Sequence, residues 1–327
     1  MRQWAQWCVV WCLAMGASVA AAKGPATTDP AKADADFAFQ GEYQGDVPAP
    51  DGMRKFGVQI IALGNGSFHA VGYPGGLPGD GWIGEEKIEA DGKLENGAVI
   101  FRTDAGSGRV ANEQIVVSDN NGNVVATIPK IERKSPTLNA APPAGAVVLF
   151  DGKNADAWEN GKLDAGSLVQ GTTSKQKFGS HSLHIEFRLP YQPEDRGQGR
   201  GNSGIYLQGR YEVQMLDSFG LKGEHNECGG IYSVKNPSVN MCLPPLAWQT
   251  YDIDYTAAKY DAAGKLTANP RVTVRHNGVI IHDNVELPGE RVTTAAPSKA
   301  GPEPGPVYLQ DHGNPVRYRN IWVVEKQ

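Results

Sequence analysis

Two-residue turn signals recur along the chain and separate short runs of β-favouring residues. Asn-Gly or Asp-Gly pairs occur at 65–66, 91–92, 96–97, 121–122 and 277–278. Such pairs supply the two successive positive φ angles of tight hairpin turns, and runs such as 57–61 and 271–275 have the length of strands. No amphipathic run in the second half is long enough to predict a helix. The chain is therefore expected to be all-β.

The first 22 residues have the form of a secretory signal peptide. Arg2 precedes a mostly apolar run over residues 4–15, and small residues at 18–22 suit cleavage near Ala20 or Ala22. The apolar run is shorter than the roughly 20 residues of a membrane-spanning helix. We therefore expect a secreted or periplasmic protein without stable membrane insertion; an uncleaved anchor is the alternative.

Length and composition divide the remaining chain into two folded units. The 327 residues exceed the roughly 100 to 200 of a usual single domain. Residues 23–35 have the composition of a flexible lead-in, and the Pro- and Ala-rich residues 132–145 have that of a linker. Residues 36–131 should form a small all-β meander or partial barrel. Residues 146–327 should form a β-sandwich or jelly roll.

The charge distribution argues against nucleic acid as a partner. The formal net charge is −5 and no Lys/Arg-rich run occurs. The chain thus lacks the long-range attraction that phosphate backbones and anionic lipid surfaces require. The sequence indicates no oligomeric state.

Two of the four cysteines would leave with the signal peptide, so Cys228 and Cys242 remain. In an oxidising compartment an isolated pair usually forms a disulfide, and closing a loop of about 15 residues is worth roughly 3 kcal/mol. Metal or thiol chemistry is the alternative. However, no Cys-x-x-Cys motif occurs, and the neighbouring His225 and Glu227 do not complete a zinc-binding spacing. We expect a Cys228–Cys242 disulfide.

Alternating polar and apolar residues in the second unit predict a polar cleft. In the run 184–189, His184, Glu186 and Arg188 would share one strand face, and the apolar residues the other. The same alternation pairs Tyr206 with Gln208, Glu212 with Gln214, Gln310 with His312, and Arg317 with Arg319. These residue types hydrogen-bond sugar hydroxyls and stack on sugar rings, so we expect them to line one concave sheet face. A solvated outer face is the alternative.

The carboxylates and His312 are candidates for proton transfer. Glu186 and Glu212 are either an acid/base pair or solvated or Arg-paired carboxylates. His312 is the better catalytic candidate, because a neutral imidazole accepts a proton near pH 7 and the adjacent Asp311 can orient it. A loop histidine without a role is the alternative.

Two further polar residues have structural alternatives. Asp217 and Arg319 suit a structural ion pair as well as a site. His225 lies in a Gly- and Glu-rich loop and would form part of the cleft rim.

Seven short motifs of the second unit occur in the order seen in one known family. They are Leu149-Phe150-Asp151-Gly152, Asn202-Ser203-Gly204-Ile205-Tyr206-Leu207, Tyr211-Glu212-Val213-Gln214, Gly230-Ile231-Tyr232, Trp248-Gln249-Thr250-Tyr251-Asp252, Leu309-Gln310-Asp311-His312-Gly313 and Arg319-Asn320-Ile321. Each motif alone is weak, but the combination is specific. Residues 146–327 thus resemble the 3-keto-disaccharide hydrolase family, whereas the first unit resembles no family.

The resemblance implies a concanavalin-like jelly roll that acts on glycosides oxidised to a ketone at C3. The ketone acidifies the C2 hydrogen, so a base removes it, the aglycone leaves C1, and water adds. By analogy, His312 or Glu212 would be the base or acid, and Arg319 or Arg188 would hold the enolate oxygen. Substrate-binding residues would be Glu186, Arg188, Asn202, Tyr206, Gln208, Gln214, Asp217, His225, Gln310 and Asp311.

No cofactor or metal is predicted. A divalent cation polarising the ketone is the alternative, since Glu186, Glu212, Asp217 and His312 are of ligand type, but their spacing predicts no metal site.

Two other functions compete with keto-glycoside cleavage. A conventional glycoside hydrolase needs two carboxyl groups about 5 to 9.5 Å apart, and Glu212-Val213-Gln214 has an amide where the second acid would be. A non-catalytic carbohydrate-binding module would need aromatic side chains on the cleft face, yet Trp158, Trp248 and Trp322 have the apolar neighbours of core residues. The sugar and its linkage are not indicated.

Overall fold

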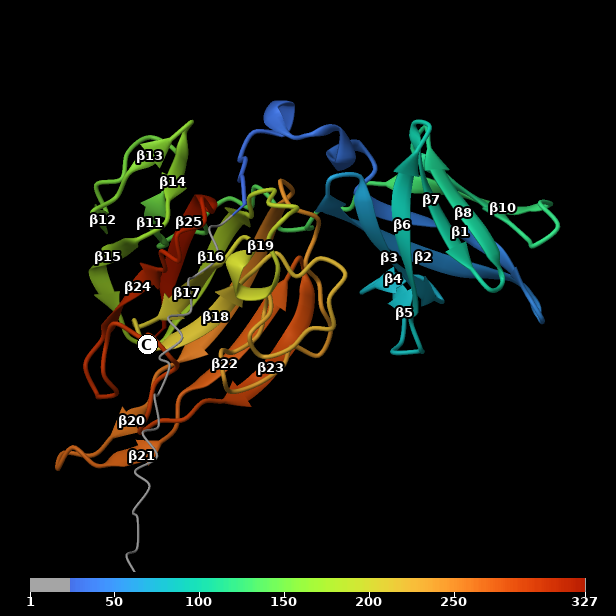
Figure 1. Cartoon of the computed structure of the whole chain (residues 1–327). Coiled ribbons are helices and arrows are strands. Elements are labelled where there is room, and N and C mark those ends of the chain that lie inside the picture. The colour runs from blue at the N-terminus through green and yellow to red at the C-terminus, as the bar shows by residue number, and fades with distance from the viewer. Residues whose placement is uncertain (1–23, 327) are drawn as a thin grey trace, which may run out of the picture.

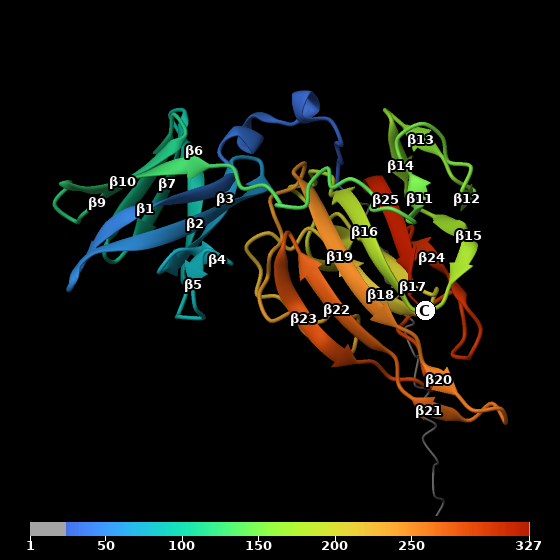
Figure 2. The ribbon, with the colours of Figure 1, turned by 180° about the vertical axis from the view of Figure 1, so that it is seen from behind.

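The computed structural model of the chain describes residues 24–326, so the expected signal peptide at 1–22 lies outside the described residues. The all-β prediction is confirmed: a closed barrel stands beside a two-sheet sandwich (Figures 1 and 2). Apart from strands and loops, the described part contains only three short 3-10 helices. Within 24–326, none of these helices has the length and apolar character needed to cross a bilayer.

The first unit is a barrel of eight antiparallel strands in the order β1-β10-β9-β8-β7-β6-β3-β2. Its strands are β1 (Gly41–Ala49), β2 (Gly52–Gly64), β3 (Ser67–Pro74), β6 (Ile88–Glu95), β7 (Ala98–Thr103), β8 (Gly106–Ala111), β9 (Gln114–Ser118) and β10 (Val124–Ile131), and the short pair β4 (Leu77–Pro78) and β5 (Gly81–Trp82) lies outside it. Closure leaves no edge strand, and side chains such as Tyr43, Ile60 and Phe68 fill the interior.

Turn chemistry explains most of the barrel hairpins. Asn65 and Asn96 have φ angles of 54° and 48° and are each followed by a glycine with positive φ. The turn expected at 91–92 is wrong, because both residues lie inside β6. Gly92 is there because a Cβ atom would stand 2.5 Å from the ring of Phe101 on the neighbouring strand.

The second unit is a sandwich of two antiparallel sheets. The larger sheet has the order β13-β14-β25-β16-β19-β22-β23, with β11 also paired to β25, and the smaller has the order β12-β15-β24-β17-β18. Their strands are β11 (Val147–Phe150), β12 (Trp158–Glu159), β13 (Leu163–Asp164), β14 (Ser167–Val169), β15 (Thr172–Phe178), β16 (His181–Arg188), β17 (Ser203–Leu207), β18 (Tyr211–Met215), β19 (Trp248–Thr256), β22 (Arg271–His276), β23 (Val279–Glu286), β24 (Gly305–Leu309) and β25 (Arg317–Glu325); β20 (Lys259–Tyr260) and β21 (Leu266–Ala268) form a separate hairpin.

The core lies between the two sheets and follows the predicted alternation. Ile185 and Phe187 of the larger sheet and Ile205 and Val213 of the smaller sheet are fully buried in one cluster. Burying each of these side chains stabilises the fold by roughly 1.5 to 3 kcal/mol. Residues at the intervening positions therefore face outward from their sheet.

The lead-in expected to be flexible is attached to the sandwich. It contains η1 (Pro30–Lys32) and η2 (Ala35–Ala38), and Thr27 forms two backbone hydrogen bonds with Tyr191. The Tyr191 hydroxyl also donates to Asp34 at 2.8 Å. The low apolar content of this segment predicted flexibility, but these hydrogen bonds fix it to the sandwich.

The linker 132–145 has no strand, but it is fixed to the outer face of the larger sheet. Ser135 Oγ lies 2.6 Å from Thr250 Oγ1, and Thr137 Oγ1 donates to Asp252 at 2.6 Å. The backbone NH of Asn139 donates to Glu186. Alternate polar residues of the linker thus match the polar positions of β16 and β19.

The expected disulfide is not formed, because Cys228 and Cys242 are free thiols. Both are buried, and each sulfur has polar partners. Cys228 Sγ lies 3.3 Å from the Tyr251 hydroxyl, and Cys242 Sγ donates to the carbonyl oxygen of Leu243 at 3.5 Å.

Candidate functional site

The polar residues expected in one cleft lie on opposite outer faces of the sandwich. Glu186 and Arg188 on β16 and Arg319 on β25 belong to the larger sheet, whereas Glu212 and Gln214 on β18 belong to the smaller one. Each set faces away from the shared core. The expectation of a single recess is therefore wrong, and the two sites are described in turn.

A hollow of about 130 Å³ opens on the outer face of the smaller sheet. This volume is below the roughly 300 to 1,000 Å³ of pockets for drug-sized ligands, so it suits a small group such as one sugar unit. The lining residues are Gln198, Asn202, Glu212, Gln214, Tyr232, Thr294, Ala295, Gln310 and His312. Asn202, Glu212, Gln214, Gln310 and His312 were expected from the sequence, and the structure brings them together here.

Glu212 is the deepest charged group of this hollow, with 2% of its surface exposed. Its Oε2 accepts a hydrogen bond from the Tyr206 hydroxyl at 2.8 Å. Burial raises the pKa of Glu212 to about 8, although the Tyr206 hydrogen bond acts in the opposite direction. Such a carboxyl is protonated in most molecules at pH 7, and its carboxylate is a stronger base than an ordinary one.

Tyr206 holds Glu212 from below the hollow. Its hydroxyl lies 3.0 Å from the carbonyl oxygen of Thr294 and accepts a hydrogen bond from Gln310 Nε2 at 3.0 Å. The side chain is 0% exposed, so the expectation that Tyr206 contacts substrate is wrong. It is a positioning residue.

Amide side chains form the rest of the hollow. In the orientation that satisfies both ends of its amide, Gln214 donates to Glu212 Oε1 at 3.1 Å and to the carbonyl oxygen of Ser203 at 2.7 Å. The Gln198 side chain donates to the carbonyl oxygen of Asn226 at 2.7 Å. Asn202 Nδ2 donates to the backbone carbonyl oxygen of Gln198 at 2.8 Å and to its side-chain oxygen at 3.1 Å. The hollow therefore surrounds one carboxyl with hydrogen-bonding groups of neutral charge.

The other four lining residues were not predicted from the sequence as site residues: Gln198, Tyr232, Thr294 and Ala295. Tyr232 ends the motif Gly230-Ile231-Tyr232, which was the available signal. Gln198 and Thr294 lie in loops without periodicity, so no sequence pattern identified them.

Other expected site residues lie beside the hollow or away from it. His225 is exposed and its ring contacts Tyr232 edge-on at 6.4 Å, which fits the expected rim. Asp311 is exposed and accepts the backbone NH of Gly313, so it caps a turn next to His312.

Gln208 and Asp217 have structural roles. Gln208 is buried and bonds the carbonyl oxygen of Phe178 and the hydroxyl of Tyr255. Asp217 forms a buried ion pair with Arg200 at 2.6 Å. Neither of them lines the Glu212 hollow.

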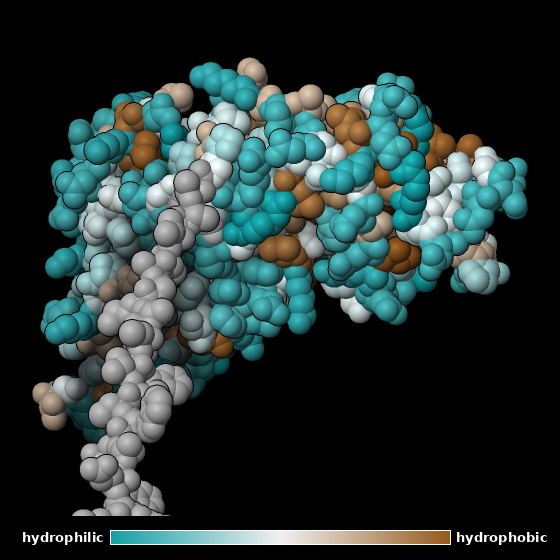
Figure 3. All heavy atoms as spheres, viewed as in Figure 1, coloured by the Kyte–Doolittle hydropathy of each residue, from teal (hydrophilic) through white to brown (hydrophobic). Residues whose placement is uncertain are grey.

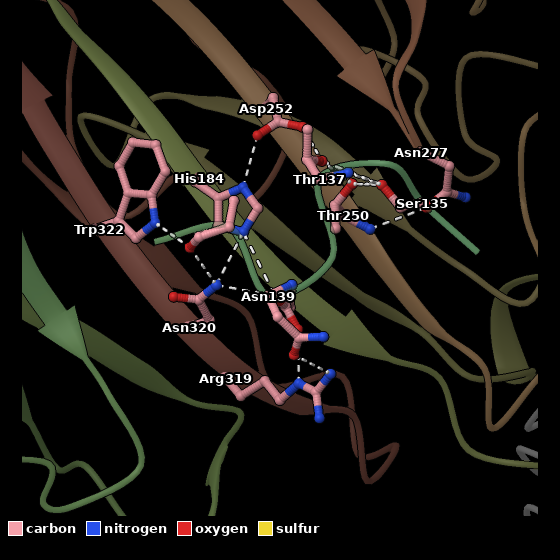
Figure 4. Close-up of polar contacts among 12 residues, drawn as sticks. Ser135, Thr137, Asn139, His184, Thr250, Asp252, Asn277, Arg319, Asn320 and Trp322 are labelled. Carbon is pink, nitrogen blue, oxygen red and sulfur yellow. Dashed lines mark hydrogen bonds and ion pairs between the residues drawn. The ribbon is translucent and has the colours of Figure 1, made fainter. Parts of the chain in front are cut away.

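The site on the larger sheet is a charged network covered by the linker (Figure 4). Glu186 accepts from Arg319 Nε at 2.6 Å and from Asn320 Nδ2 at 2.9 Å. His184 lies 2.6 Å from Asp252 and its ring stacks on Trp322 at 5.0 Å. Glu186 and His184, which the sequence placed on a polar face for substrate, are therefore bonded to other side chains of the protein.

Arg188 and Arg319 flank one aromatic ring on that sheet. Their guanidinium groups lie 5.0 and 4.1 Å from the ring centre of Trp248, and Arg188 also donates to the carbonyl oxygen of Thr28. Neither lines the Glu212 hollow. An enolate-holding role of either arginine would therefore need a substrate on the larger sheet and not in this hollow.

Within residues 24–326, no three or more His, Cys, Asp and Glu side chains gather in a way that could hold a metal ion. Of the alternative ligand set, Glu212 and His312 share the hollow, while Glu186 and Asp217 are engaged elsewhere.

Comparison with known proteins places the sandwich in a family. Residues 145–324 match the family of the 3-keto-alpha-glucoside-1,2-lyase-like domain. A crystal structure from Parabacteroides distasonis ATCC 8503, provisionally named a glycosyl hydrolase, is similar with a TM-score of 0.52 and 36% identity over 56% of this chain and 85% of that one. A second structure of the same description and organism has a TM-score of 0.41 and 18% identity over 56% and 94%. No curated protein matches the chain. Through more than half of its length, the chain belongs to the 3-keto-alpha-glucoside-1,2-lyase-like family, as its motifs predicted.

Proposed function

We propose that the Glu212 hollow cleaves 3-keto-glycosides by removing the C2 proton and eliminating the aglycone from C1. The family and the similar glycosyl hydrolase structure indicate a carbohydrate-acting hydrolase or lyase in general. The buried carboxyl of Glu212 is the observation on which the finer proposal rests. A carboxylate of raised pKa, surrounded by neutral hydrogen-bonding groups, suits proton abstraction beside a ketone.

Each step has a side chain in the hollow. The Glu212 carboxylate takes the C2 proton, and the electron pair moves onto the C3 ketone oxygen as an enolate. Gln198, Gln310 and Tyr232 are the amide and hydroxyl groups available to hold that oxygen. When the enolate collapses, the C1–O bond breaks and exposed His312 protonates the leaving oxygen. Water then adds across the C1–C2 double bond.

The hollow gives less support to the two competing functions. Conventional glycoside hydrolysis uses two carboxyl groups, and Glu212 is the only carboxyl among the nine described residues lining the hollow. A binding module would have no use for a buried acid of raised pKa, which destabilises the fold whenever it is ionised.

The substrate test uses one disaccharide in two forms. The purified protein is incubated with the 3-keto form and with the unoxidised form, and release of the aglycone sugar is followed by chromatography. We expect cleavage of the 3-keto form alone. Cleavage of the unoxidised form at a similar rate would favour a conventional hydrolase, and cleavage of neither would favour a binding module.

Activity should rise with pH through about 8. The carboxylate of Glu212 is the reactive form, so kcat/KM falls about tenfold per pH unit below its pKa of about 8. The hydrogen bond from Tyr206 lowers the pKa of Glu212. Tyr206→Phe removes this bond, so the rise of kcat/KM with pH should shift to higher pH in that variant. The pH dependence of kcat/KM checks both, with Tyr260→Phe on the β20–β21 hairpin as control. If the pH dependence of kcat/KM is the same in Tyr206→Phe as in the parent protein, Glu212 is not the base.

Gly204→Ala should displace Glu212. A Cβ atom at position 204 would lie 2.0 Å from Glu212 Oε1, so the carboxyl would have to move. A misplacement of about 1 Å costs about 10²-fold in rate, and we expect kcat/KM to fall by about that factor. Gly179→Ala is the control, because a Cβ there meets nothing within 4 Å. Equal activities of the two variants would contradict the placement of Glu212.

We also propose that the protein acts outside the cytoplasm, as the sequence of residues 1–22 suggests. Fractionation of producing cells would test this: the processed chain should leave the cytoplasmic fraction.

A further inference from the structure

A larger cavity, of about 460 Å³, lies where the barrel meets the sandwich. Its floor is apolar and comes from both units: Ile61 and Leu63 from β2, and Phe219 from the loop after β18. Its charged lining residues are the cations Lys87, Arg196, Arg200 and Lys222 and the carboxylates Glu89 and Asp217. Figure 3 shows apolar surface, in brown, among hydrophilic residues where the two units meet. The volume falls within the range of about 300 to 1,000 Å³ typical of small-molecule sites.

Two of the lining cations lack a carboxylate partner. Arg196 donates to the carbonyl oxygens of Pro193, Asp195 and Leu63 at 2.6, 2.8 and 3.0 Å. Lys87 donates to the carbonyl oxygen of Leu221 at 3.3 Å. In residues 24–326, neither cation lies within 4.0 Å of a carboxylate.

These two charges are also partly removed from water. Burial lowers the pKa of Lys87 and, together with the charge of nearby Arg200, that of Arg196. By contrast, Arg200 in the same cavity is neutralised by Asp217. Glu89 and Glu227 act on Lys87, and Asp195 on Arg196, only at longer range and without an ion pair. An anion between Lys87 and Arg196 would form the direct charge-assisted hydrogen bonds that neither cation makes with a carboxylate of the described residues.

We propose that this cavity binds an organic carboxylate with an apolar body, such as an aromatic acid. The carboxylate faces Arg196 and Lys87, and the apolar body lies on Ile61, Leu63 and Phe219. The arginine fork binds a carboxylate through two parallel hydrogen bonds, which fixes the orientation of the ligand.

The cavity and the Glu212 hollow share one short segment of chain, η3 (Gly197–Gly199). Gly197 lines the cavity and Gln198 lines the hollow. The carboxylate could come from two sources. One is the aglycone of a substrate held in the hollow, and this source rests on the proposed function. The other is a separate small acid, which is independent of that function.

Binding is tested by calorimetric titration of the purified protein with 2-naphthoate and with its neutral counterpart 2-naphthalenemethanol. We expect naphthoate to bind at least tenfold more tightly. Arg196→Gln and Lys87→Gln should each raise the Kd for naphthoate about tenfold, which is the contribution of one charge-assisted hydrogen bond. The matched controls are Arg109→Gln on β8 and Lys177→Gln on β15, both exposed and outside the cavity.

Leu221→Glu provides a second test that spares the core, since this lining residue is 40% exposed. Its added negative charge should abolish naphthoate binding. No binding at millimolar naphthoate, equal binding of the alcohol, or equal affinities in the Arg196 variant and its control would overturn the proposal.

Kinetics separate the two sources. The 3-keto-glucosides of 4-hydroxybenzoate and of 4-hydroxybenzyl alcohol differ only in the carboxylate. If the aglycone occupies the cavity, Arg196→Gln lowers kcat/KM about tenfold for the acid alone, and naphthoate inhibits competitively. If a separate acid binds, the two glucosides respond equally and naphthoate binding still depends on Arg196. Failure to cleave either glucoside would count against the proposed function, while the calorimetric result would still decide the cavity.

Discussion

Glu212→Gln is expected to lower kcat/KM for a 3-keto-glycoside by about 10³-fold. The amide has nearly the same shape, so the hydrogen bond from Tyr206 can still form to the remaining oxygen. The amide cannot accept the C2 proton, and a positioned general base contributes roughly 10² to 10⁴-fold. Steady-state kinetics at pH 8 measure the loss, and Glu303→Gln, an exposed substitution in the loop before β24, should leave the rate unchanged.

The same variant should be at least as stable as the parent protein at high pH. The pKa of Glu212 rises from 4.5 in the unfolded chain to about 8 in the fold, so ionisation opposes folding. Its unfavourable contribution is absent below about pH 4.5 and grows as the pH rises towards 8. Thermal unfolding at pH 9 should therefore show an equal or higher Tm for Glu212→Gln.

Loss of activity together with loss of stability would show that Glu212 is structural. Full activity in Glu212→Gln would transfer the role of base to another group in the hollow, of which His312 is the remaining titratable one with an exposed ring.

Strand alternation predicted side-chain orientation correctly in β16 and β18, but not for Gln208, which follows the end of β17 and bonds Tyr255 of the other sheet. Ile185 and Phe187 face the core and Glu186 faces out, and Val213 faces the core while Glu212 and Gln214 face out. Turn signals and the spacing of short strands likewise predicted an all-β chain with a sandwich. These features depend on local backbone geometry, which the sequence carries directly.

Alternation does not reveal which sheet a strand joins. β16 lies inside the larger sheet and β17 and β18 lie in the smaller, so outward faces that look equivalent in sequence point in opposite directions. Strand order depends on long-range pairing, such as β16 with β25, and no local pattern records it. Residues Gln198 and Thr294 come from loops whose conformation is set by tertiary contacts, which is why they were missed.

Glu186→Ala is expected to be strongly destabilising for a substitution on the outer face of the larger sheet. Glu186 is 0% exposed and is bound by Arg319, Asn320 and the backbone NH of Asn139. Removing it leaves the half-buried donors of Arg319 and Asn320 without their carboxylate and releases the linker at Asn139 from β16. Breaking a buried ion pair typically costs 3 to 5 kcal/mol, so we expect about that decrease in the free energy of unfolding by denaturant titration.

An exposed Glu–Arg pair of the same sheet provides the matched control. Glu286 on β23 lies 2.9 Å from Arg271 on β22, and both side chains are largely exposed. Such pairs contribute about 0.2 to 1 kcal/mol, so Glu286→Ala should lower the free energy of unfolding by no more than that. Similar losses in the two variants would contradict the structural role of the buried network.

The pH dependence of stability distinguishes the network from simple packing. Burial alone would raise the pKa of Glu186, but hydrogen bonds from His184, Asn320, Arg319 and Asn139 outweigh it and lower the pKa to about 2. This fall from 4.5 corresponds to about 3 kcal/mol of stability, present above pH 4.5 and lost as the pH falls towards 2.

The contribution of His184 to stability has the opposite pH dependence. Burial would lower its pKa, yet its hydrogen bonds with Asp252 and Glu186 outweigh burial and raise it above 6.5. Its contribution is therefore complete below pH 6.5 and is lost as the pH rises through the folded-state pKa. The network should stabilise most between about pH 4.5 and 6.5, and the difference in unfolding free energy between the parent and Glu186→Ala should be largest there. A difference that stays constant from pH 2 to 9 would mean that Glu186 acts through packing, because lost packing carries no proton linkage.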